Sequence, residues 1–344
     1  MNIKLSNIKL PHIRLPEKFQ FSKKKEKIIK IGLDWGFSSL KVVFLESPYD
    51  TYILNDARII QLPSKDLHLR SLLKDLDLSG GVNLGICGPN VVVRYVAMAK
   101  MNEEEFRRSI RYEAASHLPF PVEESSLDGA ILKGLPDNQM LAMLAAAKNN
   151  FIKQRLKLFQ EAGIKVNVLD VDSLALINAF NYNQPSLAKE GISKNEHNQA
   201  VEEISKQEDS ISSGAVALLN IGASVTNINI LEDGIPHFTR DINVAGKDLT
   251  QEASQEVAIA NFVAEIRKSF DYYEAASTAI INKIFLSGGG SLISDLASNI
   301  ENYLGIKIEQ WDPFSNFEFA PGLNKADIQK NSAQFAVAVG LALR

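Results

Sequence analysis

The sequence predicts an α/β fold with two related halves, on three observations. Near the start of each half, a glycine-bearing turn joins two strand-like runs, at 31–41 and at 220–227. The third observation is the Ser-Gly-Gly-Gly-Ser segment at 287–291, which follows the apolar run 284–286 and precedes a helix-like segment. Turns of this kind expose backbone N–H groups, and a helix start adds the positive end of its dipole. We therefore expect the three turns to converge on a polyphosphate.

The composition is that of a soluble globular protein. The 344 residues are enough for two domains, with 45% hydrophobic and 23% charged residues and a net charge of −4. The single cysteine, Cys87, excludes an internal disulfide and predicts a reducing compartment, and the five histidines show no metal-ligand spacing. No apolar run approaches the roughly 20 residues of a membrane helix, and the N-terminal residues lack the apolar h-region and the cleavage site of a signal peptide. We expect a cytoplasmic protein without a nucleic-acid partner.

Residues 1–27 are expected to form a basic, extended N-terminal arm. Residues 1–30 carry a net charge of +7, which leaves −11 for the rest of the chain. The arm repeats Ile-Lys-Leu at 3–5, Ile-Lys-Leu-Pro at 8–11 and Ile-Arg-Leu-Pro at 13–16, and its prolines exclude a continuous helix. Two interpretations stay open: a solvated arm, or an arm that contacts anionic lipid, where each basic residue contributes about 1 kcal/mol.

In the first half, apolar runs bounded by turn residues predict strands, and amphipathic spacing predicts helices. The expected strands are 28–33, 40–46, 58–61, 82–87, 91–97, 126–133, 140–147 and 165–170. The expected helices are 67–76, a helix that begins after Asn102, and 150–162. Asn102 with Glu105 matches a capping box, and Pro119 marks the end of that helix. Gly163 ends the third helix.

The second half begins after a change in composition. Residues 183–213 contain six acidic and three basic residues and few apolar ones, which predicts a flexible acidic linker because little surface can be buried there. Strands are then expected at 215–221 and 226–230, and helices at 261–273, 292–304 and 332–343.

The order of the three turns is similar to that of the actin-like ATPase superfamily. Within it, the segments 112–121 (YEAASHLPFP), 265–273 (EIRKSFDYY) and 338–343 (AVGLAL) resemble the PilM family of type IV pilus assembly proteins. The resemblance covers about 28–344. It implies an actin-like ATPase fold, with two lobes around a nucleotide cleft and a small extra subdomain like that of FtsA division proteins.

The resemblance also implies domain boundaries. Lobe I is expected at 28–182, with the extra subdomain at about 94–167. Lobe II is expected at 214–330. The C-terminal helix, 331–344, is expected to return to lobe I.

A nucleotide site for ATP and Mg²⁺ follows from the same resemblance. The Asp34 carboxylate would face the Mg²⁺ shell through water. The residues expected to contact phosphates or nucleoside are Gly36, Ser38, Ser39, Lys41, Asn220, Gly222, Ala223, Ser224, Thr226, Gly246, Lys247, Glu265, Lys268, Gly288, Gly289 and Gly290. The chemistry is consistent, since a polyphosphate needs many donors and Mg²⁺ needs hard oxygen ligands.

Two departures from the family pattern bear on activity. The second turn usually opens with an aspartate, and Asn220 stands there; its amide lacks the charge that holds hydrated Mg²⁺ or polarises an attacking water. In the first turn, Trp35 and Phe37 stand where small or aliphatic residues are common, and Phe37 could crowd a phosphate. We therefore expect bound ATP with weak or absent hydrolysis, or a retained fold with an impaired cleft.

The family resemblance implies a cytoplasmic scaffold, peripheral to the inner membrane through its partners. It would serve type IV pilus or related secretion machinery, and a groove beside the small subdomain would take the N-terminal peptide of a PilN-like inner-membrane protein. Self-association is a further expectation. The arm's Ile-Lys-Leu-Pro repeats resemble such peptides, so the arm could occupy the groove of its own or a neighbouring molecule.

Two other functions remain as alternatives. One is an active ATPase or a sugar-kinase-like enzyme; against it, no aspartate stands out in the sequence as base for a sugar hydroxyl. The other is an FtsA-like filament protein at the membrane; against it, the sequence ends at 341–344 without an amphipathic helix.

Overall fold

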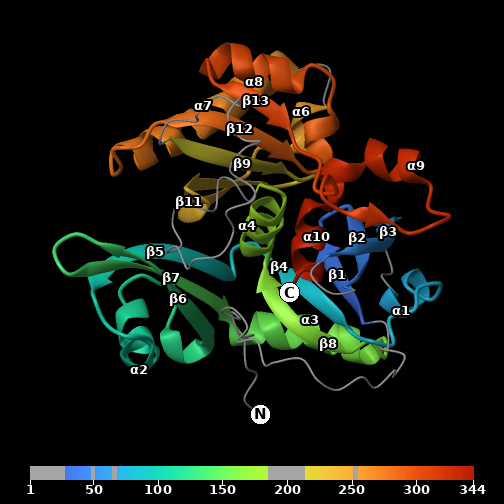
Figure 1. The fold of residues 1–344 in the computed structure, drawn as a ribbon, viewed down its shortest axis with the longest axis horizontal. Helices are drawn as coiled ribbons and strands as arrows, with labels where there is room; N and C mark the ends of the chain where they lie inside the picture. The colour runs from blue at the N-terminus through green and yellow to red at the C-terminus, as the bar shows by residue number, and fades with distance from the viewer. Residues whose placement is uncertain (1–27, 48–50, 64–67, 185–213, 251–254) are drawn as a thin grey trace, which may run out of the picture.

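The computed structural model describes residues 28–47, 51–63, 68–184, 214–250 and 255–344. It contains two lobes, each built on a mixed sheet, and a smaller third sheet beside the first lobe (Figure 1). The expected N-terminal arm lies outside the described residues, as does the expected linker after Gln184. The α/β class is as predicted.

The sheet of lobe I has six strands. In spatial order they are β14 (Glu318–Phe319), β3 (Ile53–Gln61), β2 (Ser39–Glu46), β1 (Ile29–Trp35), β4 (Val82–Ile86) and β8 (Val166–Val171). One face packs its apolar side chains against α1 (Leu69–Leu72) and α3 (Asn149–Glu161), and the other against α4 (Asp172–Asn183) and α10 (Ala336–Ala342). The sheet is therefore buried on both faces, as its nearly continuous apolar strands require.

The sheet of lobe II has five strands. In spatial order they are β11 (Ile235–Ile242), β10 (Thr226–Glu232), β9 (Ala215–Ile221), β12 (Ile281–Ser287) and β13 (Lys307–Gln310). Helices α7 (Gln255–Glu274) and α8 (Leu296–Leu304) cover one face. The other face packs on α4, where the Phe180 ring lies 4.8 Å from that of Phe285 and 5.4 Å from that of Trp311.

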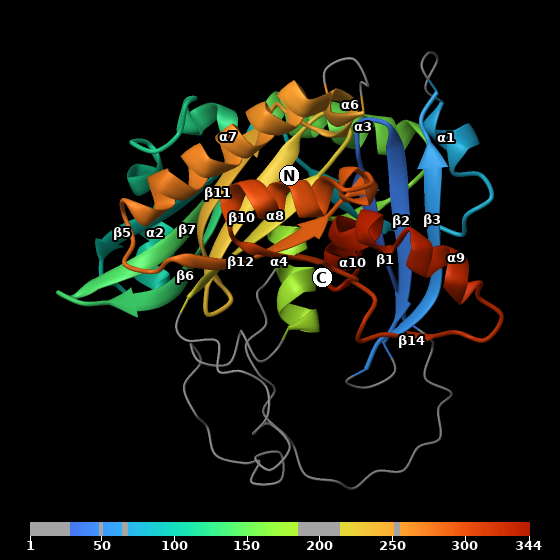
Figure 2. The same cartoon turned by 90° about the horizontal axis from the view of Figure 1, so that it is seen from above.

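Helices α4 and α10 lie between the two lobes (Figure 2). Two glycines allow the close packing of α10. A Cβ on Gly32 of β1 would lie 2.0 Å from the carbonyl oxygen of Ala338, and one on Gly340 would lie 1.7 Å from that of Ala175. Helix α4 was not expected, and the expected linker begins at its last residue, Asn183. Buried residues lie on several sides of α4, so this helix lacks the amphipathic spacing that identifies a surface helix.

The third sheet is inserted between β4 and α3 and has the order β5-β7-β6. Its strands are β5 (Val91–Ala99), β6 (Ser125–Leu135) and β7 (Gln139–Lys148), and α2 (Glu103–Ala114) packs on one face. The expected capping box is present, because Asn102 accepts from Glu105 N–H while the Glu105 carboxylate accepts from Asn102 N–H. Of the expected subdomain, the part up to Lys148 forms this sheet, whereas β8 pairs with β4 in lobe I.

Two helix predictions differ from the structure. The helix expected at 67–76 is only the single turn α1. The helix expected from 292 begins at Leu296, because Asp295 takes a left-handed conformation with φ 59°. The third glycine turn therefore opens a 3₁₀ turn, η3 (Gly289–Leu292), and no α-helix dipole starts there. The C-terminal segment likewise begins as a 3₁₀ turn, η4 (Ser332–Phe335), before α10.

Candidate functional site

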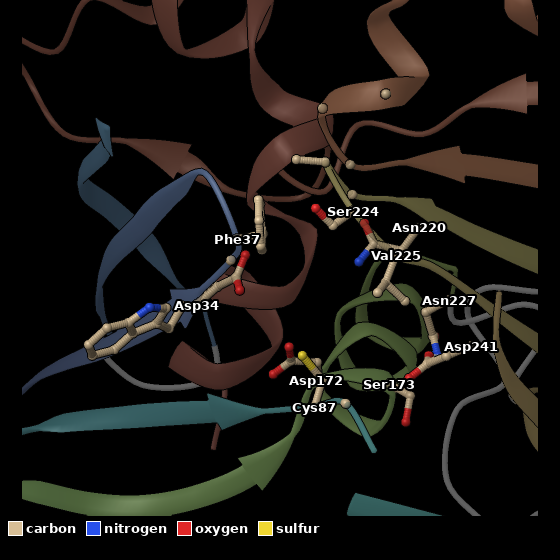
Figure 3. A pocket seen from close by; sticks show the side chains of 18 of the residues that line it. Asp34, Phe37, Cys87, Asp172, Ser173, Asn220, Ser224, Val225, Asn227 and Asp241 are labelled. Carbon is tan, nitrogen blue, oxygen red and sulfur yellow. The ribbon is translucent and has the colours of Figure 1, made fainter. Parts of the chain in front are cut away.

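A cavity of about 1180 Å³ lies between the lobes and takes its lining from both (Figure 3). Lobe I contributes the β1–β2 turn and the carboxyl ends of β4 and β8; lobe II contributes the β9–β10 turn, the end of β11, α6 (Gly246–Leu249) and the third turn. Ligands of open α/β sheets bind outside the carboxyl ends of the strands. The predicted residues that line the cavity are Asp34, Gly36, Ser38, Ser39, Lys41, Asn220, Gly222, Ala223, Ser224, Gly246, Lys247, Gly288, Gly289 and Gly290.

The first turn carries a buried carboxylate and a lysine. Asp34 and Lys41 are opposite residues of the β1–β2 pair, and Lys41 Nζ lies 3.6 Å from Asp34 Oδ2. The turn is closed by Gly36 N–H, which donates to the Ser39 carbonyl at 3.1 Å. A Cβ on Gly36 would lie 2.8 Å from Lys41 Nζ, so the glycine leaves room for the ammonium group. Phe37 at the tip is 77% exposed.

The second turn is joined to the start of α6 by two backbone hydrogen bonds. Gly246 N–H donates to the Gly222 carbonyl at 2.9 Å, and Lys247 N–H donates to the Ala223 carbonyl at 3.1 Å. The hydroxyl of Ser224 is buried and has no hydrogen-bond partner in the structure. An unpartnered buried hydroxyl costs free energy, so a ligand that hydrogen-bonds to it would bind favourably.

The third turn packs directly against the second. A Cβ on Gly288, whose φ is +83°, would lie 2.4 Å from the Ile221 carbonyl oxygen and 2.6 Å from Asn220 Oδ1. One on Gly290 would lie 2.3 Å from the Ile221 side chain. Any side chain there would separate the two turns. Asn220 Oδ1 also accepts a weak hydrogen bond of 3.4 Å from the Ser287 hydroxyl.

The floor of the cavity carries a second buried carboxyl group, Asp172, at the start of α4 (Figure 3). Burial, reinforced by the nearby charge of Asp34, raises the Asp172 pKa to about 8. Its Oδ1 has no hydrogen-bond partner. The carboxylate of Asp172 is the main reason why the neighbouring Cys87 thiol has a raised pKa. The sequence analysis did not single out this aspartate.

The sequence does contain a signal for Asp172. It directly follows the strand 166–171, whose carboxyl end meets the cavity edge where Asp34 also lies. On the lobe II side, burial raises the pKa of Asp241, and its Oδ1 accepts from the Asn227 amide at 2.7 Å. Both residues line the cavity and neither was expected to.

Three predicted residues lie outside the cavity lining. Thr226 is fully buried, and its hydroxyl donates to the Val244 carbonyl at 2.9 Å. Glu265 and Lys268 pair with each other on α7 at 2.6 Å, as their spacing predicts, but away from the lining. The Glu265 carboxylate lies 2.9 Å from the guanidinium of Arg240, and Arg240 is a residue of the cavity lining.

The bulky residues of the first turn have separate surroundings. Trp35 packs edge-on against Phe159 at 5.7 Å and lies under the guanidinium of Arg155 at 4.4 Å. Both Trp35 and Phe37 line the cavity. The Phe37 ring lies 5.7 Å from Lys247 Nζ on the opposite lobe. This is a cation–π contact across the cleft.

Within the described ranges, no three His, Cys, Asp or Glu side chains are grouped so as to hold a metal ion. Over the same part of the chain, no helix has the length and apolar character needed to cross a bilayer.

A family model described as type IV pilus assembly protein PilM matches residues 32–270 and 256–344. The chain belongs to this PilM family. A solved PilM-PilN type IV pilus biogenesis complex is similar to it, with a TM-score of 0.74 and 24% identity over 92% of this chain and 98% of that one. The PilM-type fold expected from the sequence is thereby confirmed.

Two more distant structures are also similar to this PilM-family chain. One is a Bacteroides thetaiotaomicron protein with an actin-like ATPase fold and unknown function, with a TM-score of 0.47 and 12% identity over 91% of this chain and 98% of that one. The other is an archaeal actin homologue in complex with ADP, with a TM-score of 0.39 and 12% identity over 92% of this chain and 98% of that one.

Proposed function

We propose that this PilM-family chain binds ATP with Mg²⁺ in the cavity between its lobes and hydrolyses it weakly or not at all. The observation that carries the proposal is the meeting of the three glycine turns around one cavity, between Lys41 of lobe I and Lys247 of lobe II. Backbone without side chains, lysines on both sides and the unpartnered Ser224 hydroxyl together suit a polyphosphate.

The donor set also suits the metal. Asp34 is a buried carboxylate on the first turn, and hard oxygen ligands with several retained waters are what Mg²⁺ prefers. When bound, the ion would neutralise phosphate charge. Asn220 contributes only an amide where an acid would hold a hydrated ion, and this substitution supports holding of ATP over its hydrolysis.

Isothermal titration of the full chain with Mg-ATP tests the nucleotide proposal. We expect one site per chain, and we expect Ser224→Ala to weaken binding by about 10- to 150-fold, since one hydrogen bond to a charged ligand is lost. Ser116→Ala, an exposed serine after α2 outside the cavity, is the matched control. The absence of measurable binding to the wild-type chain would refute the proposal.

We further propose that the chain acts as a cytoplasmic scaffold at the inner membrane by docking the N-terminal peptide of a PilN-like protein. Strand β5 is an edge strand of the small sheet, and Val91–Arg94 of β5 line the far end of the cavity together with Arg155. Edge strands and apolar pockets are what extended peptides use. Fluorescence anisotropy of a labelled peptide, with Arg94→Glu as variant and Arg108→Glu on α2 as control, tests this site.

Asp172 favours a second candidate function, ATP hydrolysis. Its carboxyl group is buried at the cavity floor, has an unpartnered oxygen and has a pKa of about 8, near the working range of a general base. In this role it would accept a proton from an attacking water. Phosphate release that rises between pH 7 and pH 9 and disappears in Asp172→Asn would favour the enzyme over the scaffold that only holds ATP.

A further inference from the structure

Glu232, the last residue of β10, is the centre of a polar cluster. Its Oε1 accepts hydrogen bonds from the Tyr273 hydroxyl at 2.7 Å and the Ser277 hydroxyl at 2.9 Å. Its Oε2 lies 3.3 Å from His237 Nε2 and 3.4 Å from Lys133 Nζ. The Lys133 and Glu232 side chains are only 28% and 20% exposed. Partial burial limits solvent screening, so this pair is stronger than a surface ion pair.

The cluster joins two parts of the molecule that belong to different lobes. Lys133 lies on β6 of the small sheet, whereas Glu232, His237, Tyr273 and Ser277 all belong to lobe II. Among the described residues, Lys133–Glu232 is the one ion pair between the small sheet and lobe II. The turn after Glu232 is also held from the other side, because the Asn181 amide of α4 donates to the Gly234 carbonyl at 2.9 Å.

The opposite end of the small sheet is attached to lobe I. The chain enters β5 directly after β4 and leaves β7 directly into α3. At this base, Lys148 N–H donates to the Asn90 carbonyl at 3.0 Å, and the Ser126 hydroxyl donates to Asn149 Oδ1 at 2.8 Å. The small sheet thus has its base on lobe I and its Lys133 contact on lobe II, and β5 and β11 lie beside each other (Figure 1).

We propose that the small sheet is a strut between the lobes, and that the Lys133–Glu232 pair is the latch that makes it follow lobe II. The regulatory consequence of this inference rests on the proposed function, in which the chain binds both nucleotide and peptide. A ligand that draws the glycine turns of the two lobes together moves lobe II relative to lobe I. Through the latch, that motion shifts β5, whose residues line the far end of the cavity. Nucleotide occupancy therefore regulates peptide docking.

Hydrogen exchange of the full chain, without ligand, tests the latch itself. We expect Lys133→Met to raise exchange at least 3-fold in the β6–β7 end and in the β10–β11 turn, and to leave the base of the small sheet unchanged. Lys133→Arg keeps the charge and is expected to restore protection. Lys100→Met, an exposed lysine just after β5, is the matched control. Equal exchange in Lys133→Met and wild type would overturn the latch.

The regulatory consequence is tested by the affinity of the partner-derived peptide with and without Mg-ATP. In the wild-type chain we expect the peptide affinities with and without Mg-ATP to differ at least 3-fold. In Lys133→Met we expect the two affinities to be equal, and in Lys133→Arg we expect the difference to return. The inference would be overturned, without any consequence for the proposed function, if Mg-ATP still changed the peptide affinity of Lys133→Met. The same would follow if the wild-type chain bound both ligands but Mg-ATP did not change its peptide affinity. Failure of the wild-type chain to bind Mg-ATP would instead refute the proposed function, and the exchange experiment would still decide on the latch.

Discussion

Gly85, on strand β4, and Asp172, the first residue of helix α4 after strand β8, occupy adjoining space in lobe I. A Cβ on Gly85 of β4 would lie 2.2 Å from Asp172 Oδ1 at the start of α4. The buried carboxyl group at the cavity floor therefore depends on the absence of a side chain on the strand beside it. A glycine inside a buried strand otherwise weakens that strand, so its presence marks a close approach.

Gly85→Ala is expected to destabilise the protein by about 1 to 3 kcal/mol, because the added methyl group overpacks the strand against the Asp172 carboxyl group. Asp172→Ala removes most of that contact, so the double variant is expected to be more stable than the sum of the single changes predicts. Urea unfolding of the four proteins measures this coupling. Additive effects would show that the Gly85–Asp172 contact is unimportant, since the Leu341 side chain, 3.2 Å from the same Cβ, is then the dominant obstacle.

Asp172 is expected to make stability depend on pH. Its carboxyl pKa is about 3.8 in the unfolded chain and about 8 in the folded one. Between these values the folded protein holds a proton that the unfolded chain has released, so the free energy of unfolding falls as pH rises and levels off above pH 8. Asp172→Asn cannot titrate. Its stability relative to wild type is therefore expected to increase from pH 5 to pH 8.5, by up to about 4 kcal/mol.

Urea unfolding of both proteins at pH 5, 7 and 8.5 checks this prediction. Titrating groups that do not interact with Asp172 are common to both proteins and cancel in the difference, whereas Cys87, whose pKa is raised mainly by Asp172, does not cancel. A difference that does not change with pH would mean that Asp172 ionises normally in the folded protein.

The strands and capped helices of the fold were largely predictable because their signals are local. The alternation in 226–230 and the Asn102–Glu105 pair each depend on a few neighbouring residues. Helix α4 was missed because it is buried between two sheets and shows no polar face. The helix expected at the third turn failed because a left-handed residue, Asp295, delays the start of α8.

The candidate site also contains some residues that could be predicted from the sequence and others that could not. Each glycine turn is a short local motif, and the order of the three turns along the chain indicated a common site; they do line one cavity. Asp172 and Asp241 escaped notice because their importance depends on which strand ends become neighbours. Thr226 and Glu265 were placed at the site by family resemblance. In the structure, the Thr226 hydroxyl donates a hydrogen bond within lobe II, and the Glu265 carboxylate pairs with Arg240.

Gly340→Ala tests the packing of α10. In an exposed helix this change would stabilise by about 1 kcal/mol, since alanine has the higher helix propensity. Here the new Cβ would lie 1.7 Å from the Ala175 carbonyl oxygen of α4, so we expect the free energy of unfolding to fall by about 1 to 3 kcal/mol. Gly134→Ala on β6 is the matched control, because nothing lies within 4 Å of that Cβ position. Similar melting temperatures for the two variants would contradict the close contact of α10 with α4.

Phe37 and Lys247 are expected to act together on nucleotide affinity. Lys247→Met removes a cation beside the phosphate turns and is expected to weaken Mg-ATP binding by about 1.5 to 3 kcal/mol, the usual range for a hydrogen bond to a charged group. Phe37→Leu keeps the apolar bulk but removes the ring that faces Lys247 Nζ at 5.7 Å, and is expected to cost about 0.5 to 1 kcal/mol. Because the ring acts through the ammonium group, Phe37→Leu should add little once Lys247 is Met.

Titration calorimetry at two salt concentrations measures both effects, and the loss in Lys247→Met should shrink at high salt. The control is Lys325→Met, which removes a similar lysine–phenylalanine contact, 5.0 Å from the Phe319 ring and outside the cavity lining. If Phe37→Leu tightens binding instead, Phe37 crowds the phosphates, as the sequence first indicated. Its ring would then obstruct ATP, and Lys247 would contact the phosphates without help from Phe37.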